Sequence, residues 1–296
     1  MKNSFSQLAI MLSLALLLGG PREAIAQQQE KPLSPIADMD WNTRTATHLL
    51  DRAGFGGTPD EIAELASMSP GQAVARLVNY HRVPQDERLT DFQPQPYVPP
   101  PPKQGQTKYD RNLQVFFGRV AQDNGQMERA RDWWLGRMLT SRRPLEEKLT
   151  LFWHGHLTSS NAGVYMSSAM IRQNKLFRRH AAGNVEELIL GVSKDPAMLR
   201  YLNNNANVKG RPNENYAREL MELFTLGEGN YSEDDIKQAA RALTGWTFTS
   251  DGAFYFRRNM HDDGEKTFLG ETGDFDGTDI IEIIIRQRQH ASFICT

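Results

Sequence analysis

The spacing of apolar and polar residues predicts a mainly α-helical chain. Helix-start signals recur, in which a Ser, Thr or Asp cap precedes Pro or stands three residues before an acidic or amide side chain. Thr58 with Pro59 and Ser69 with Pro70 are two such starts, and they predict a pair of short helices. A further helical pattern begins at Trp41. The apolar periodicity predicts longer helices over 112–140, 144–157, 163–180, 184–193, 196–202, 212–226 and 232–243.

Two stretches interrupt this helical pattern. Residues 92–103 contain four consecutive prolines, which favour a stiff polyproline II linker or surface loop. Residues 246–258 alternate around Asp251-Gly252, a dipeptide that favours a β-hairpin turn. A polar, acidic loop and a last helix, "TDIIEIIIRQ", are expected to follow, with "GDFDGTD" (273–279) as a turn and helix cap. The predicted fold is a mainly α, multi-helix globular domain with a small β-hairpin near 246–258.

The first residues have the pattern of an export signal. Lys2 precedes the apolar run 8–20, and "AIA" ends a signal peptide expected over 1–26. The run is shorter than the ~20 residues that span a bilayer, so cleavage is favoured over a membrane anchor. We expect a periplasmic or secreted protein with a flexible lead-in over 27–42, one domain over 43–296, and no membrane span after signal cleavage.

Composition narrows the classes of function. The 296 residues carry a formal charge of −2 and no basic tract, so nucleic acid is not an expected partner. Cys295 is the single cysteine, which excludes an intramolecular disulfide and makes thiol catalysis a poor hypothesis. The sequence contains no GxSxG elbow, phosphate loop, Rossmann fingerprint, HExxH or CxxC motif.

"LFWHGHL" places two histidines one residue apart, and this raises the question of a metal. On a helix, His156 continues a predicted core-facing row that contains Leu145, Leu149 and Phe152. His154 then lies about 200° around the helix axis from His156, so both could hold one metal only if the helix unwound between them. We favour His156 as a buried, hydrogen-bonded histidine. Its use as a functional ligand or acid–base group is the alternative.

The predicted helix 212–226 carries a narrow polar face on a wide apolar one. The wide apolar arc predicts that this helix is largely buried, with its polar residues directed at solvent, a cavity or a partner. One interpretation is a row of exposed ion pairs. The other is a carboxylate cluster in which Glu219 or Glu222 acts as a metal ligand or general base, oriented by Arg218. The polar face comprises Glu214, Asn215, Arg218, Glu219, Glu222 and Thr225.

Two further stretches contain polar candidates. His261 and Asp262 stand in "MHDDGEKTFLG", on an expected loop with metal-compatible groups, although Asp and Gly are also common in ordinary turns. Residues 203–215 contain many asparagines, which favour tight turns and which alternatively suit a polar, sugar-like ligand.

Several long segments, in order, resemble the bacterial domain-of-unknown-function 1800 family. They are "HLLDRAGFGGTPDEI", "RPLEEKLTLFWHGHLTSS", "DPAMLRYLNNNANVKGRPNENYARELMELFTLGEGNYSEDDIKQAARALTGWTF" and "HDDGEKTFLG". The resemblance implies a large, exported, mainly helical bacterial protein, with a second exported protein encoded nearby as its partner. It implies no catalytic residues, because the family has none established. The end of the chain, "RQRQHASFICT", departs from the family pattern, so we expect a C-terminally truncated or frame-shifted version.

These observations support two hypotheses of function. The first is an exported protein with a polar, metal-binding cleft that performs metal-assisted hydrolysis, with Glu219, Glu222 and Arg218 as catalytic candidates. The second is a non-enzymatic envelope scaffold or partner-binding protein, in which the same side chains satisfy one another. The first hypothesis requires that the candidate ligands of a divalent metal lie close together in the fold. These candidates are His156, His261, Glu219, Glu222 and Asp262.

Overall fold

The computed structural model describes residues 34–85 and 89–295. The expected signal peptide and residues 27–33 of the expected lead-in lie outside these residues. The chain divides into two units, Met1–Asp40 and Trp41–Thr296. In the first unit the described residues end in a single 3-10 turn, Asp38–Asp40.

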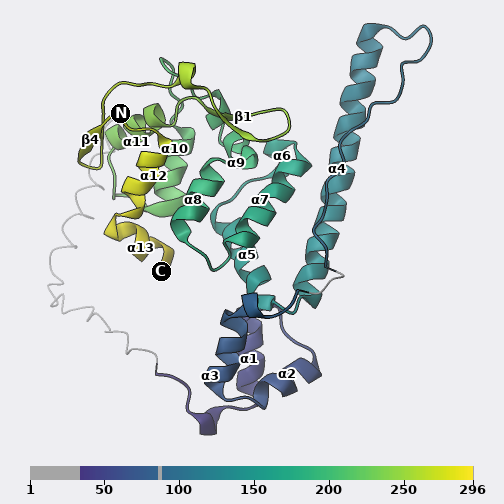
Figure 1. Cartoon of the computed structure of the whole chain (residues 1–296), viewed down its shortest axis with the longest axis vertical. Helices are drawn as coiled ribbons and strands as arrows, with labels where there is room; N and C mark the ends of the chain where they lie inside the picture. Colours follow the sequence, from purple (N-terminus) through teal and green to yellow (C-terminus); the bar gives the residue numbers. More distant parts are fainter. Residues whose placement is uncertain (1–33, 86–88, 296) are drawn as a thin grey trace, which may run out of the picture. The chain divides into compact units, whose positions relative to one another are not determined.

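Helices make up most of the second unit, which confirms the prediction of a mainly α fold (Figure 1). Short 3-10 turns occur at Tyr80–Arg82, Asn204–Ala206 and Arg258–Met260. A π-helix, Leu220–Thr225, follows α10 directly. The α-helices are α1 (Thr43–Ala53), α2 (Pro59–Ala66), α3 (Pro70–Val78), α4 (Lys108–Thr140), α5 (Pro144–His156), α6 (Asn161–Val164), α7 (Ser167–Arg179), α8 (Val185–Ser193), α9 (Pro196–Tyr201), α10 (Asn215–Glu219), α11 (Glu233–Ala242), α12 (Gly277–Ile285) and α13 (Arg288–Cys295). Among the described helices, none combines the length and apolarity needed to cross a bilayer.

Local capping chemistry explains where the short helices begin. The Thr58 hydroxyl accepts a hydrogen bond from the Glu61 amide, and the Glu61 carboxylate accepts one from the Thr58 amide at 2.7 Å. The same reciprocal pattern joins Ser69 to Gln72 at the start of α3. Each box satisfies two of the amides that a helix start leaves free. The predicted starts of α2 and α3 are therefore confirmed.

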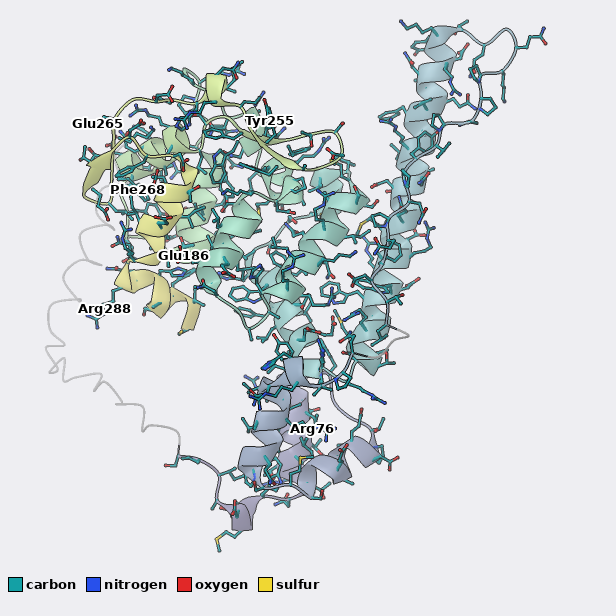
Figure 2. The ribbon with its side chains drawn as sticks, viewed as in Figure 1. Arg76, Glu186, Tyr255, Glu265, Phe268 and Arg288 are labelled. Atoms are coloured by element: carbon teal, nitrogen blue, oxygen red, sulfur yellow. The ribbon has the colours of Figure 1, made fainter. Side chains whose placement is uncertain are left out.

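The expected β-hairpin is present, and a second hairpin follows it. β1 (Trp246–Phe248) pairs antiparallel with β2 (Phe254–Phe256), and Gly252 in the turn has a φ of +80°. β3 (Lys266–Phe268) pairs with β4 (Glu271–Gly273), where the sequence predicted only a polar loop. That expectation was wrong because the strands are three residues long and Leu269, not Asn or Asp, precedes the turn glycine. Phe268 is fully buried, whereas Tyr255 in β2 is 54% exposed (Figure 2).

The main hydrophobic core lies among α7, α8, α9, α10, the π-helix, α11 and α12. Its largest fully buried side chains include Trp246, Tyr216 and Phe177. The buried Tyr216 hydroxyl donates to Ser193 Oγ at 2.5 Å, so its polar end is satisfied. A smaller, separate cluster joins α1, α2 and α3. The main core, which includes Phe177 of α7 and Trp153 of α5, fixes the two helices that carry the candidate site.

The Pro-rich segment lies along α4. The indole nitrogen of Trp133 donates to the Thr90 carbonyl at 2.8 Å, and Gln122 donates to the Gln95 carbonyl at 2.9 Å. Further toward the helix start, Tyr97 packs against Gly118, where a Cβ would collide with its ring. The helix starts four residues before the predicted position because Thr107 caps it through the Asp110 amide at 3.1 Å.

Candidate functional site

The buried face of α5 is not the one that the apolar row predicted. The buried residues are Glu146, Glu147, Thr150 and Trp153, while Phe152 of the predicted core row is 47% exposed. The prediction was wrong because it placed charged residues outside. Two arginines from other helices neutralise Glu147 inside the protein, which offsets the cost of burying its charge.

His156 lies at the end of α5, against the π-helix. It is half-buried, and its Nε2 donates a hydrogen bond to the Phe224 carbonyl at 2.9 Å. A carbonyl only accepts, so Nε2 carries a proton. His156 therefore joins α5 to the helix that carries Glu222.

The structure brings Glu219 and Glu222 near each other. Burial, together with the negative charge of Glu222, raises the pKa of Glu219. Glu222 accepts a hydrogen bond from the Tyr231 hydroxyl at 3.3 Å. Arg218 does not form the ion pair with Glu222 that a row of ion pairs along the helix would require. It binds the Glu233 carboxylate through two hydrogen bonds of 2.8 Å and lies 3.5 Å from Glu214.

A change of helix type explains the altered polar face in this segment. Thr225, expected on the polar face, is fully buried, and its hydroxyl donates to the Leu220 carbonyl at 2.5 Å. Leu223, expected on the apolar face, is 53% exposed. The wider π-helical turn rotates these residues away from the positions that α-helical geometry gives them.

His261 and Asp262 lie in a separate set of contacts. His261 is 2% exposed, and its Nδ1 donates to the Thr244 carbonyl at 3.0 Å. Asp262 accepts two hydrogen bonds from Arg241, at 2.9 and 3.1 Å. The Arg241 hydrogen bonds lower the pKa of Asp262 to about 2. Asp262 thus holds its loop against α11, and His261 holds it against the turn that follows α11.

The asparagine-rich segment forms turns, as one interpretation expected. Asn207 is fully buried and donates to the Ala240 carbonyl at 2.8 Å, while its side-chain oxygen accepts from the Asn213 amide at 2.9 Å. Asn203 adopts the left-handed conformation, with a φ of +59°. These side chains brace the backbone between α9 and α10.

Across residues 34–85 and 89–295, no three or more His, Cys, Asp or Glu side chains come together where they could hold a metal ion. The two candidate carboxylates of the 212–226 segment are neighbours, and His156 contacts the same π-helix. His261 and Asp262 bind Thr244 and Arg241 instead.

A buried polar centre is built around Glu147, and the sequence did not predict it. This carboxylate is fully buried and accepts from Arg137 Nε at 2.8 Å and from the Trp134 indole at 3.1 Å. Arg178 adds two hydrogen bonds of 3.0 Å each. Both guanidinium groups also lie over the Trp133 ring, 5.4 and 5.1 Å from its centroid. This arrangement joins α4 and α7 to α5.

A cavity of about 270 Å³ lies beside this centre, and we call it the His154 pocket. Four helices, α4, α5, α6 and α7, and the loop after α5 contribute to it. Its walls combine two indoles and two thioethers with a few polar groups, which is the usual composition of a small-molecule site. The lining residues are Met127, Ala130, Arg131, Trp133, Trp134, His154, Ser159, Ser160, Asn161, Met170, Ile171 and Asn174.

The imidazole in this pocket is neutral at neutral pH. Burial, with the positive charge of Arg178 second, lowers the pKa of His154 to about 4. Its ring lies 4.7 Å from the ring of Trp134 and 4.7 Å from that of Phe177. The Asn174 amide is 3.1 Å from His154 Nε2, so a neutral Nε2 accepts from Asn174.

Two side-chain oxygens among the pocket residues lack a hydrogen-bond donor. They are Asn161 Oδ1 and Asn174 Oδ1, both buried. Asn174 as a whole is only 6% exposed. Ser159, on the same wall, donates instead to Gln173 Oε1 at 2.5 Å. A buried acceptor without a donor is costly. Both oxygens have almost no accessible surface, so a bound group can donate to either one once its side chain turns into the cavity.

Residues 48–296 match the family model described as "Protein of unknown function (DUF1800)". The chain belongs to this family. The DUF1800 match confirms the resemblance found in the sequence. No curated protein and no solved structure matches the chain.

In this DUF1800 chain, local sequence contained part of the signal for the pocket. The HxH motif marks the end of α5, and it drew attention to His154 and His156 as a pair. The two consecutive tryptophans, Trp133 and Trp134, lie in the part of α4 that lines the pocket. Nothing local indicates Asn174, because an asparagine inside a helix is ordinary on a solvent face.

Proposed function

We propose that this chain is an exported binding protein that holds a small, neutral, hydroxyl-rich molecule in the His154 pocket. The observation that carries the proposal is the pair of buried amide oxygens, on Asn161 and Asn174, without donors among residues that line a cavity. Export rests on the signal-peptide pattern of residues 1–26.

The chemistry of the pocket selects the class of ligand. Amide oxygens accept hydrogen bonds only from donors, so a hydroxyl or N–H group satisfies them and an anion does not. The neutral imidazole of His154 supplies no positive charge, and the cation among the lining residues, Arg131, is exposed to solvent. Trp133 and Trp134 line the cavity and supply apolar surface against which the C–H side of a ring can pack.

Size sets a second limit. At ~30 Å³ for each water molecule, the pocket has room for about nine waters, which is the scale of one sugar ring or polyol. Such a ligand would satisfy the acceptors through its hydroxyl groups and pack its C–H face on an indole.

Metal-assisted hydrolysis stays a prediction. His156, His261 and Asp262 each bind a structural partner, and Glu222 binds Tyr231. A metal bound by these groups requires rearrangement of those contacts. Metal analysis of the purified mature protein, after exposure to zinc, manganese, iron and calcium, tests it directly. We expect less than stoichiometric metal, and near-stoichiometric metal that is lost in His156→Ala would contradict this.

Binding to the His154 pocket can be tested with a panel of neutral sugars and polyols and their carboxylate counterparts. We expect at least one neutral monosaccharide or cyclic polyol to raise the melting temperature and change tryptophan fluorescence, because Trp133 and Trp134 line the pocket. The carboxylates should bind more weakly. Asn174→Leu, which keeps the side-chain volume and removes the acceptor, should weaken binding by about tenfold or more.

The matched control is Asn112→Leu, an exposed asparagine on α4 outside the pocket. It should leave the affinity unchanged. If no neutral compound binds, or if Asn174→Leu folds and binds as well as the parent protein, the proposal is overturned.

A further inference from the structure

The first turns of α4 carry an exposed apolar stripe. Its members recur at helical spacing and point to one side of the helix, and we call them the α4 stripe. Two phenylalanines at its centre are more than half exposed, which is unusual for side chains of this size. The members and their exposed fractions are Tyr109 71%, Leu113 37%, Phe116 60%, Phe117 63% and Val120 40%.

The same face of α4 is buried further along the helix. Continuing the spacing leads to Met127, Ala130 and Trp134, which line the His154 pocket against α5 and α7. Asp123 of α4 accepts a hydrogen bond from the Ser167 amide. Between the start of α4 and Asp123, the hydrogen bonds and ring contacts that α4 makes with other segments involve residues 95–106. The α4 stripe thus continues the apolar face that α5 and α7 cover further along the helix, at positions where those helices do not cover it.

The segment that carries the stripe is cationic. Between Tyr97 and Val120 there are four basic residues, Lys103, Lys108, Arg111 and Arg119, and one acidic residue, Asp110. This gives the segment a formal charge of +3 in a chain whose total is −2. Asp110 is already engaged, since it caps the helix start with Thr107.

We infer that the α4 stripe docks on an anionic lipid surface. Aromatic and aliphatic side chains enter the boundary between headgroups and acyl chains, while neighbouring Lys and Arg side chains stay at the level of the anionic headgroups. Tyr109 and Phe116 supply the apolar part, and Lys108 and Arg111 supply charge from the same turns. The helix lies on the surface and does not cross it.

A second copy of this chain is a poorer occupant. Two α4 stripes packed together would bring two +3 segments into contact, with only one acidic residue on each to offset them. A lipid surface with negative headgroups has the opposite charge, so each cation contributes attraction instead of repulsion.

Vesicle co-sedimentation of the mature chain tests the inference. The vesicles are phosphatidylcholine alone or phosphatidylcholine with about one third phosphatidylglycerol. We expect binding to the anionic vesicles, weakened by salt, and little binding to the neutral ones. The double variant Phe116→Ser, Phe117→Ser should lower the partition coefficient by about tenfold or more.

The control variant is Leu135→Ser, Leu139→Ser, which removes two exposed apolar side chains, 55% and 70% exposed, from the other end of α4. It should bind like the parent chain. Replacing Lys103 and Lys108 with glutamine should lower binding to anionic vesicles and leave helix content unchanged.

Three results would overturn the inference. The first is no binding of the folded parent chain to anionic vesicles. The second is equal losses in the two double variants. The third is a dimer in light scattering that Phe116→Ser, Phe117→Ser converts to a monomer without any vesicle effect.

Discussion

Replacing Glu147 with alanine is expected to lower the free energy of unfolding by about 3–5 kcal/mol. The variant leaves Arg137 and Arg178, which are 2% and 8% exposed, as buried charges that have lost their common carboxylate. Trp134 loses its hydrogen-bond acceptor as well. The removal of one partner from a buried ion pair costs far more than the pair contributes, because the remaining charges are not resolvated.

Urea unfolding followed by helical circular dichroism measures this effect. The matched control is Glu64→Ala, which removes an ion pair to Arg76 whose side chains are 52% and 43% exposed. It should cost no more than about 1 kcal/mol. Equal effects of the two substitutions would contradict a buried ion-pair centre.

A second variant keeps the test decisive if Glu147→Ala does not fold. Replacing Glu147 and its two arginine partners with apolar residues, as Arg137→Met, Glu147→Leu, Arg178→Met, removes the charges that Glu147→Ala leaves without a carboxylate. Glu146, 4.0 Å from Arg137, keeps its ion pair with Arg143 at 3.5 Å. We expect it to recover much of the lost stability. Failure of the triple variant to improve on Glu147→Ala would show that packing, not charge, dominates at this position.

Features set by neighbouring residues were predictable from the sequence. Thr58 with Glu61 and Ser69 with Gln72 form their capping boxes within four residues, so the pattern of letters contains the whole interaction. The Asp251-Gly252 turn is local in the same sense and places the first hairpin correctly.

Features set by distant residues were not predictable in this way. Glu147 reads as a solvent-facing charge on α5, and only its partners 10 and 31 residues away reverse that assignment. The same holds for Asn174, which meets His154 from another helix. The π-helix likewise turns Thr225 inward through a backbone change that no propensity indicates. The sequence therefore indicated that α5 carries candidate functional residues. Contacts with distant residues determine which face of α5 is buried.

Replacing Asp195 with asparagine is expected to change how stability depends on pH. Asp195 caps α9 by accepting from the Ala197 and Met198 amides at 3.0 and 3.1 Å, and it accepts from Gln173 at 3.0 Å. Burial raises the pKa of Asp195 to about 7, although these hydrogen bonds oppose the shift. Asparagine keeps a cap oxygen and removes the charge.

The sign follows from the raised pKa. A carboxyl that binds its proton more tightly in the folded state stabilises the fold fully below its unfolded pKa, near 3.8. That contribution is lost as the pH rises toward about 7, and it is on the order of 4 kcal/mol at ~1.4 kcal/mol for each pKa unit. Relative to the parent, Asp195→Asn should therefore gain stability between pH 5 and pH 8.

Urea unfolding of parent and variant across this range gives the difference in free energy directly. The control is Asn184→Ala, which removes the uncharged cap of α8 and should cost about 1 kcal/mol at every pH. Arg172 and Tyr216 are the other titratable groups that interact with Asp195. Burial raises the pKa of Tyr216 far above this range, so it stays neutral throughout. A pH-independent difference for Asp195→Asn would mean that Gln173 and the two α9 amides keep the carboxylate ionised inside the fold.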